Sequence, residues 1–152
     1  MTSRFLDVDA ARLALQHLTP AIAAQLARPD VSGLGVLHLV VLDPACCVDA
    51  APRVLVEHSI GDRARWDVDY ADYAHRKALL SWRHRMDSRR LLLMAPHRLG
   101  ADEPPLWGGV WLDGLVVAAS GAFPIWDECF SLMAAAQLRA QAWVAADPAG
   151  GR

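Results

Sequence analysis

Asparagine is absent from the 152 residues of this chain, and Lys77 is the only lysine among 15 basic residues. Cysteine is scarce too: Cys46, Cys47 and Cys129 are odd in number, and two of them are adjacent. Such a set is a poor disulfide framework, and the lack of a Cys-x-x-Cys pair argues against a structural zinc site. We therefore expect reduced, partly buried thiols.

Long apolar runs are also missing. The longest apolar strand candidate, Leu34–Leu42, contains His38 and is far shorter than the ~18 residues that a membrane span needs. The segment after Met1 becomes charged and amphipathic, unlike the apolar centre of a secretory signal. The net charge of −2 calls for neither nucleic acid nor an anionic membrane as a partner. We expect a cytoplasmic protein that binds neither.

The common catalytic signatures are absent: the chain has no serine-hydrolase elbow, no His-Glu-x-x-His and no P-loop. The pair Gly33-x-Gly35 precedes a predicted strand, whereas a dinucleotide-binding fingerprint follows one. The sequence therefore leaves open whether the protein is an enzyme.

What is present fits one packed domain over residues 1–152. Hydrophobic residues make up 54% of the chain and charged residues 21%, which is enough for a core and too little charge for wholesale disorder. Apolar periodicity predicts a first helix over 7–28, which Thr19-Pro20 either kinks or divides into two. Further helices are predicted over 68–86 and from Pro124 onward.

Five segments read as strands: 34–42, 54–58, 91–94, 110–112 and 115–117. Asp113-Gly114 lies between the last two and predicts a type I′ hairpin. The expected fold is α+β, a mainly antiparallel five-stranded sheet with helices packed on it, in the order α-β-β-α-β-β-β-α.

Three motifs add a resemblance to this element order. Lys77-Ala78 in the second helix is followed by Ser81 and then by Asp87-Ser88. Gly108-Gly109 precedes the hairpin, and Ser120-Gly121 stands shortly before Asp127-Glu128 at the start of the last helix. With these motifs the chain resembles the GlcG/HbpS-like family, also called haem-degrading-domain-like proteins. It departs from the family in having Asp43-Pro44-Ala45-Cys46 where Asp-Ala-Gly-Gly is usual.

The resemblance implies a small-molecule ligand, either haem or an organic acid, and assembly into a homo-oligomer. It makes Lys77 and Asp127 the candidates for acid–base chemistry. The candidate ligand-binding residues are His75, His97, Trp107, Gly109, Ser120, Gly121 and Trp126. No metal site is expected apart from haem iron, which His75 or His97 would ligate.

Each candidate also has a structural interpretation. Lys77 can be a solvated helix charge, Asp127 can stabilise a helix dipole, and the histidines and tryptophans can be ordinary packing residues. Three functions therefore remain open. One is a ligand-binding module with a pocket between the second helix, the hairpin and the start of the last helix. The second is a small enzyme without a cofactor that uses Lys77, Asp127 or a histidine as acid or base on a carbonyl or carboxylate substrate. The third is an oligomer-forming interaction subunit.

Overall fold

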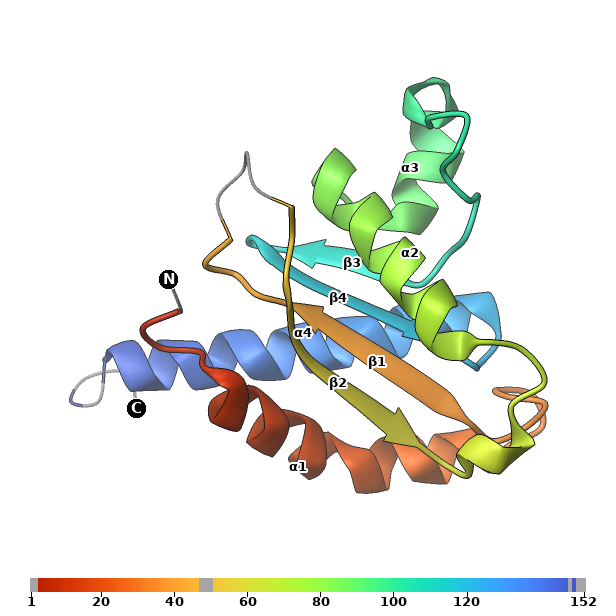
Figure 1. Cartoon of the computed structure of the whole chain (residues 1–152). Coiled ribbons are helices and arrows are strands. Elements are labelled where there is room, and N and C mark those ends of the chain that lie inside the picture. Colours follow the sequence, from red (N-terminus) through yellow and green to blue (C-terminus); the bar gives the residue numbers. More distant parts are fainter. Residues whose placement is uncertain (1–2, 47–50, 148, 150–152) are drawn as a thin grey trace.

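A single antiparallel sheet forms the centre of the molecule (Figure 1). The computed structural model describes residues 3–46, 51–147 and 149. Its four strands lie in the order β2-β1-β4-β3, and every neighbouring pair is antiparallel. The strands are β1 (Leu37–Leu42), β2 (Val54–Ile60), β3 (Gly109–Leu112) and β4 (Leu115–Ser120). This arrangement confirms the predicted α+β class.

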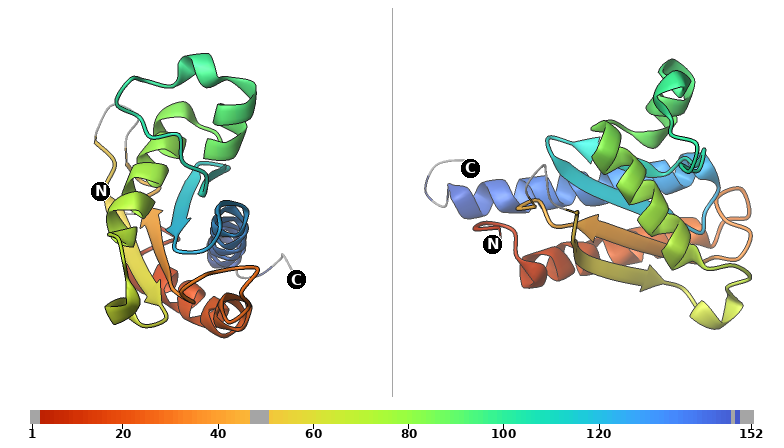
Figure 2. Two further views of the ribbon diagram at one scale, coloured as in Figure 1. Left: turned by 90° about the vertical axis from the view of Figure 1, so that its right-hand side faces the viewer. Right: turned by 45° about the horizontal axis from the view of Figure 1, so that its top comes forward.

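Helices cover both faces of the sheet (Figure 2). The long helices α1 (Val8–Leu26) and α4 (Pro124–Ala146) lie side by side on one face. Helix α2 (Tyr70–His84) crosses the other face over β1, β3 and β4. The short helix α3 (Ser88–Met94) follows α2 and extends beyond the sheet (Figure 1).

The central strand β1 is buried at every residue because both of its faces are covered. Leu39 and Val41 join the core formed with α1 and α4, whereas Val40 and Leu42 join a smaller cluster with α2. The partner strand β4 alternates in the same way. A strand covered on both faces reads as a continuous apolar run, and that run is the signal that predicted β1 from the sequence.

The third predicted strand was wrong. Residues 91–94 belong to helix α3, so the element order is α-β-β-α-α-β-β-α and the sheet has four strands among the described residues. Leucine and methionine are strong helix formers, and Asp87-Ser88 is a helix start signal. Only Leu91 of this segment is fully buried, and Leu93 and Met94 are exposed. Burial in a sheet therefore does not outweigh the helical preference of these residues.

The β3–β4 turn and the first helix are the other two features for which the sequence carries a local signal. Asp113 and Gly114 have φ values of 51° and 88°, as the predicted type I′ turn requires. Helix α1 is one helix that contains Pro20, and it begins where the Asp7 carboxylate accepts a 2.8 Å hydrogen bond from the Ala10 N–H.

No helix in the described part of the chain is long and apolar enough to cross a membrane. Cys46 and Cys129 are free thiols, as expected, and Cys47 lies outside the described residues. Within the same residues, no group of three or more His, Cys, Asp or Glu side chains could hold a metal ion.

Candidate functional site

Lys77 is a buried residue of α2, with 5% of its surface exposed. It shares the buried stripe of the helix with Ala74, Ala78 and Ser81, at the three- and four-residue spacing of one helix face. The small alanine side chains allow the helix to pack close to the sheet. The lysine side chain extends to the end of β4. The alternative interpretation of Lys77 as a solvated helix charge is therefore wrong.

Three acceptors surround the Lys77 ammonium. Its Nζ donates to the Asp127 Oδ2 at 2.8 Å, to the Ala119 carbonyl at 3.0 Å and to the Ser120 Oγ at 3.3 Å. An ammonium has three N–H groups, so each of them has a partner. The end of β4 and the start of α4 thus meet α2 at one buried cation, as the predicted pocket requires.

The carboxylate of Asp127 is equally buried, with 2% of the residue exposed. Its second oxygen, Oδ1, accepts a 2.9 Å hydrogen bond from the Ala122 N–H. Burial raises the pKa of Asp127 to about 6, although the charge and hydrogen bond of Lys77 act in the opposite direction. This carboxyl group therefore titrates nearer neutrality than an ordinary aspartate.

The raised pKa of Asp127 gives a testable pH dependence. Because the folded pKa of about 6 lies above the unfolded value of 3.8, the folded state holds this proton more tightly. The contribution of Asp127 to stability therefore falls as the pH rises from about 4 through about 6. We expect the carboxyl ¹³C signal of Asp127 to titrate with a midpoint near 6. Asp127→Asn removes that signal and identifies it, and a midpoint at or below 3.8 would contradict the expectation.

Two glycines make room for the buried pair. Gly108 has φ of +122°, and a Cβ there would lie 2.8 Å from the Ala119 carbonyl oxygen and 3.1 Å from the Lys77 Cδ. A Cβ on Gly109 would lie 2.5 Å from the Ser81 Oγ, and the Gly109 N–H is engaged with the Ser88 Oγ at 3.1 Å. Gly109 therefore serves close packing, and its N–H group is not free for a ligand.

Glu128 forms a second ion pair next to the first. Only 6% of its side chain is exposed, and its two oxygens accept from the Nε of Arg89 at 3.0 and 2.9 Å. The consecutive acids at the start of α4 thus pair with cations from α2 and α3. Sequence reasoning did not find Arg89, and the only available signal was its helix-start position two residues after Asp87.

A cavity of about 280 Å³ adjoins this cluster. Lys77 and Trp107 line it, together with Leu106 from the preceding loop and Pro124 from the start of α4. Pro105 is the remaining lining residue. The predicted site residues Lys77, Ser120, Asp127 and Trp107 are therefore brought to one place, with an apolar hollow beside a buried cation.

Other candidates lie elsewhere. His75 faces β2, where its Nε2 is 2.7 Å from the Glu57 Oε1 but outside hydrogen-bonding geometry. His97 is exposed in the short turn of residues 96–98. Trp126 contacts Phe130, with ring centroids 6.0 Å apart. Gly121, with φ of +131°, allows close approach to the backbone of Val36 and Leu37 at the start of β1. None of the four lines the cavity beside Lys77.

Comparison of the chain with known protein families and with curated proteins finds no match. The function must therefore be argued from the site itself.

Proposed function

We propose that this is a cytoplasmic protein that binds a small organic acid in the cavity beside Lys77, in the manner of the GlcG/HbpS-like family that its motifs resemble. The observation that carries the proposal is that Lys77, a buried lysine, lines an apolar hollow. Pockets of this kind combine apolar walls with a few fixed polar groups. The chain places its single lysine there, although all its other basic residues are arginines.

The contacts of Lys77 suggest how an acid is held. The 3.3 Å bond to the Ser120 Oγ is the longest of its three hydrogen bonds, and Ser120 is a neutral partner. A ligand carboxylate that replaced this hydroxyl would accept a shorter, charge-assisted hydrogen bond. Trp107, Leu106 and Pro124 then contact the apolar part of the ligand. The Asp127 pair stays intact and keeps the ammonium in position.

The site favours an organic acid over haem. Neither His75 nor His97 lines the cavity, so the described lining residues include no imidazole to ligate iron. An organic acid needs no imidazole, because its carboxylate can accept a hydrogen bond from Lys77.

A titration tests the binding proposal. We expect butyrate to shift the indole N–H signal of Trp107 in ¹H–¹⁵N spectra of the whole chain, with saturation in the millimolar range. Removing the indole in Trp107→Ala should weaken butyrate binding about tenfold, the equivalent of roughly 1.4 kcal/mol, as followed through the backbone N–H signals of Lys77 and Ser120 in the same spectra. The matched control is Trp143→Ala, because Trp143 is 57% exposed on α4 and lines no described cavity.

Two results would overturn the proposal. One is the absence of any butyrate shift at Trp107 up to 100-fold excess over protein. The other is equal weakening by Trp107→Ala and Trp143→Ala, which would place the acid elsewhere. Mass spectrometry of the protein under native conditions adds a direct view of any acid that co-purifies.

An enzymatic alternative rests on the raised pKa of Asp127. A carboxyl group that titrates near 6 is suited to general acid–base chemistry at neutral pH. In this alternative Lys77 donates to a substrate carbonyl oxygen while the carboxylate of Asp127 removes an adjacent C–H proton. Asp127 releases that proton to solvent, and solvent returns a proton to the carbon. The alternative predicts that the methyl protons of pyruvate exchange into D₂O in the presence of the protein, and that Asp127→Asn abolishes the exchange.

A further inference from the structure

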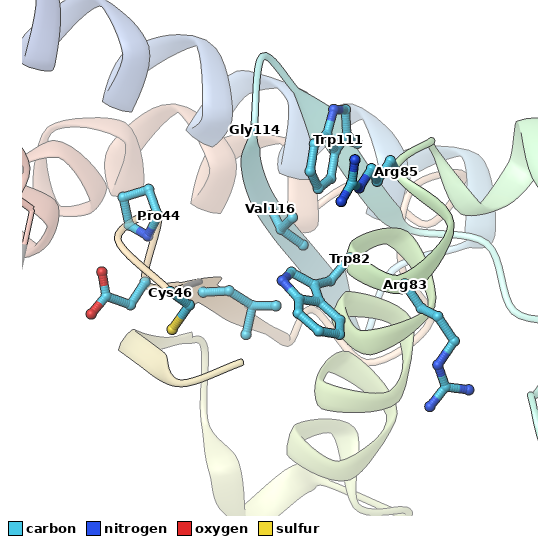
Figure 3. A pocket seen from close by; sticks show the side chains of 10 residues that line it. Pro44, Cys46, Trp82, Arg83, Arg85, Trp111, Gly114 and Val116 are labelled. Carbon is cyan, nitrogen blue, oxygen red and sulfur yellow. The ribbon is translucent and has the colours of Figure 1, made fainter. Parts of the chain in front are cut away.

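A second and larger pocket lies on the same side of the sheet, at the opposite end of β4 (Figure 3). Its volume is about 460 Å³, within the usual size range of small-molecule sites. It opens where α2 ends and where the β3–β4 hairpin turns, and Gly114 of that turn lines it. Lys77 and Trp107 do not line it, so it is separate from the cavity described above.

Two indoles form the aromatic wall of this pocket. Trp82 comes from the last turns of α2 and Trp111 from β3, and both are only partly buried. Figure 3 shows them on the same side of the hollow, with Val116 of β4 beside them. Leu42 of β1 adds a further apolar side chain. Indoles presented in this way offer flat apolar surface to an aromatic ring.

Among the described residues, one positive charge at the pocket is left without a partner. Arg83 is paired with Glu103 at 2.6 Å, and Asp43 is paired with Arg53 at 2.8 Å. The side chain of Arg85, by contrast, makes no hydrogen bond or ion pair with any residue in the described part of the chain. Arg85 and Trp111 both line the pocket (Figure 3). The net character of the lining is therefore apolar and cationic.

The backbone of Arg85 is unusual for an arginine. It caps the C-terminus of α2 with φ of 53° and ψ of 44°, in the left-handed region. Glycine is the residue that helices ordinarily use there, because a Cβ is disfavoured in this conformation. Arg85 therefore has an unfavourable backbone conformation, and its side chain forms no hydrogen bond or ion pair within the described residues that would offset it. That combination points to a role outside folding.

We propose that this pocket binds a planar aromatic carboxylate, whose ring lies against Trp82 and Trp111 and whose carboxylate accepts hydrogen bonds from Arg85. The guanidinium fork matches the two oxygens of a carboxylate. The apolar wall supplies contact area, and the paired states of Arg83 and Asp43 leave Arg85 as the group that selects for negative charge. The proposal is independent of butyrate binding beside Lys77.

Calorimetric titration of the whole chain with 2-naphthoate tests this assignment. We expect binding to the wild type, and binding weakened at least about tenfold by Arg85→Gly because the charge-assisted hydrogen bonds are lost. Glycine suits the left-handed backbone, so Arg85→Gly should unfold at the same temperature as the wild type or higher. Arg85→Lys keeps the charge but loses the fork, and should give an intermediate affinity.

Three controls separate the pocket from general attraction of anions. Arg90→Ala removes an exposed arginine that lines none of the described pockets, and should leave 2-naphthoate affinity unchanged. The neutral 2-naphthamide should bind more weakly than 2-naphthoate and be insensitive to Arg85→Gly. Trp107→Ala should not affect 2-naphthoate, just as Arg85→Gly should not affect butyrate.

The assignment is overturned by any of three results. These are no binding of 2-naphthoate to the wild type, equal binding to the wild type and Arg85→Gly, or equal weakening by Arg85→Gly and Arg90→Ala. Each leaves the proposal for the cavity beside Lys77 intact, because that site is read out through butyrate and Trp107.

Discussion

Replacing Lys77 with methionine is expected to lower the free energy of unfolding by about 2–3 kcal/mol, because Asp127 loses its buried cation and must take up a proton at pH 7.5 to stay buried. Only 3% of the Asp127 side chain is exposed, so water cannot take the place of the ammonium. The Ala119 carbonyl and the Ser120 hydroxyl lose a donor in the same variant. Urea unfolding at pH 7.5 measures the effect.

A double-mutant cycle distinguishes the loss of the ion pair from the loss of lysine packing. Lys77→Met combined with Asp127→Asn removes both charges, and asparagine can still accept the Ala122 N–H. We expect the double variant to lose about 2 kcal/mol less free energy of unfolding than the two single variants lose in sum. Arg76→Met is the control on the same helix. Its 3.9 Å contact with Asp72 is exposed, so its removal should change stability by less than about 0.5 kcal/mol.

Stability of Lys77→Met equal to that of the wild type would contradict the structure at this point. It would mean that the ammonium does not stabilise the Asp127 carboxylate, and the ¹³C midpoint of Asp127 would then be unchanged in the variant, where we expect it to move to higher pH. An additive cycle would instead mean that Lys77 and Asp127 do not interact.

The convergence of Lys77 and Asp127 was predictable because it rested on signals that act locally. The Asp113-Gly114 turn determined the β3–β4 pairing, and Pro124 determined the start of α4. These signals place Ser120 and Asp127 at one junction, and the structure shows that Lys77 of α2 reaches both of them. Lys77 was singled out through a family motif, and its place on the buried stripe of α2 with Ala74 is seen only in the structure.

The features that were not predicted depend on contacts between distant segments. Residues 91–94 carry too short an apolar run for periodicity to separate a strand from a helix, and their burial is decided by neighbours. Glu128 looked like an ordinary acid at a helix start, and only the position of α3 reveals its bond to Arg89. The pocket beside Trp82 and Trp111 was missed because it joins α2 to the hairpin turn, two segments whose distance no local pattern indicates.

Gly108→Ala is expected to be the second severely destabilising substitution, with a loss of about 3 kcal/mol or more. Two costs combine there. A φ of +122° is a region that residues with a Cβ rarely adopt, and such strain alone amounts to about 1–3 kcal/mol. The new Cβ would also lie 2.9 Å from the Asp127 Cβ and 2.8 Å from the Ala119 carbonyl oxygen. Because the oxygen belongs to backbone, relief requires β4 or α4 to move, which adds the cost of overpacking.

Two other glycines separate these costs. Gly114 has φ of +88° but nothing within 4 Å of the position that a Cβ would occupy, so Gly114→Ala should cost only the backbone strain, about 1–2 kcal/mol. Gly33 has neither a positive φ nor a neighbour within 4 Å, and Gly33→Ala should be neutral or stabilising by up to about 1 kcal/mol. The expected order of stability, from highest to lowest, is therefore Gly33→Ala, Gly114→Ala and Gly108→Ala, measured by urea unfolding under one set of conditions. If Gly108→Ala were as mild as Gly114→Ala, the close approach of Gly108 to the Lys77–Asp127 pair would be disproved, because strain alone would then account for the whole loss.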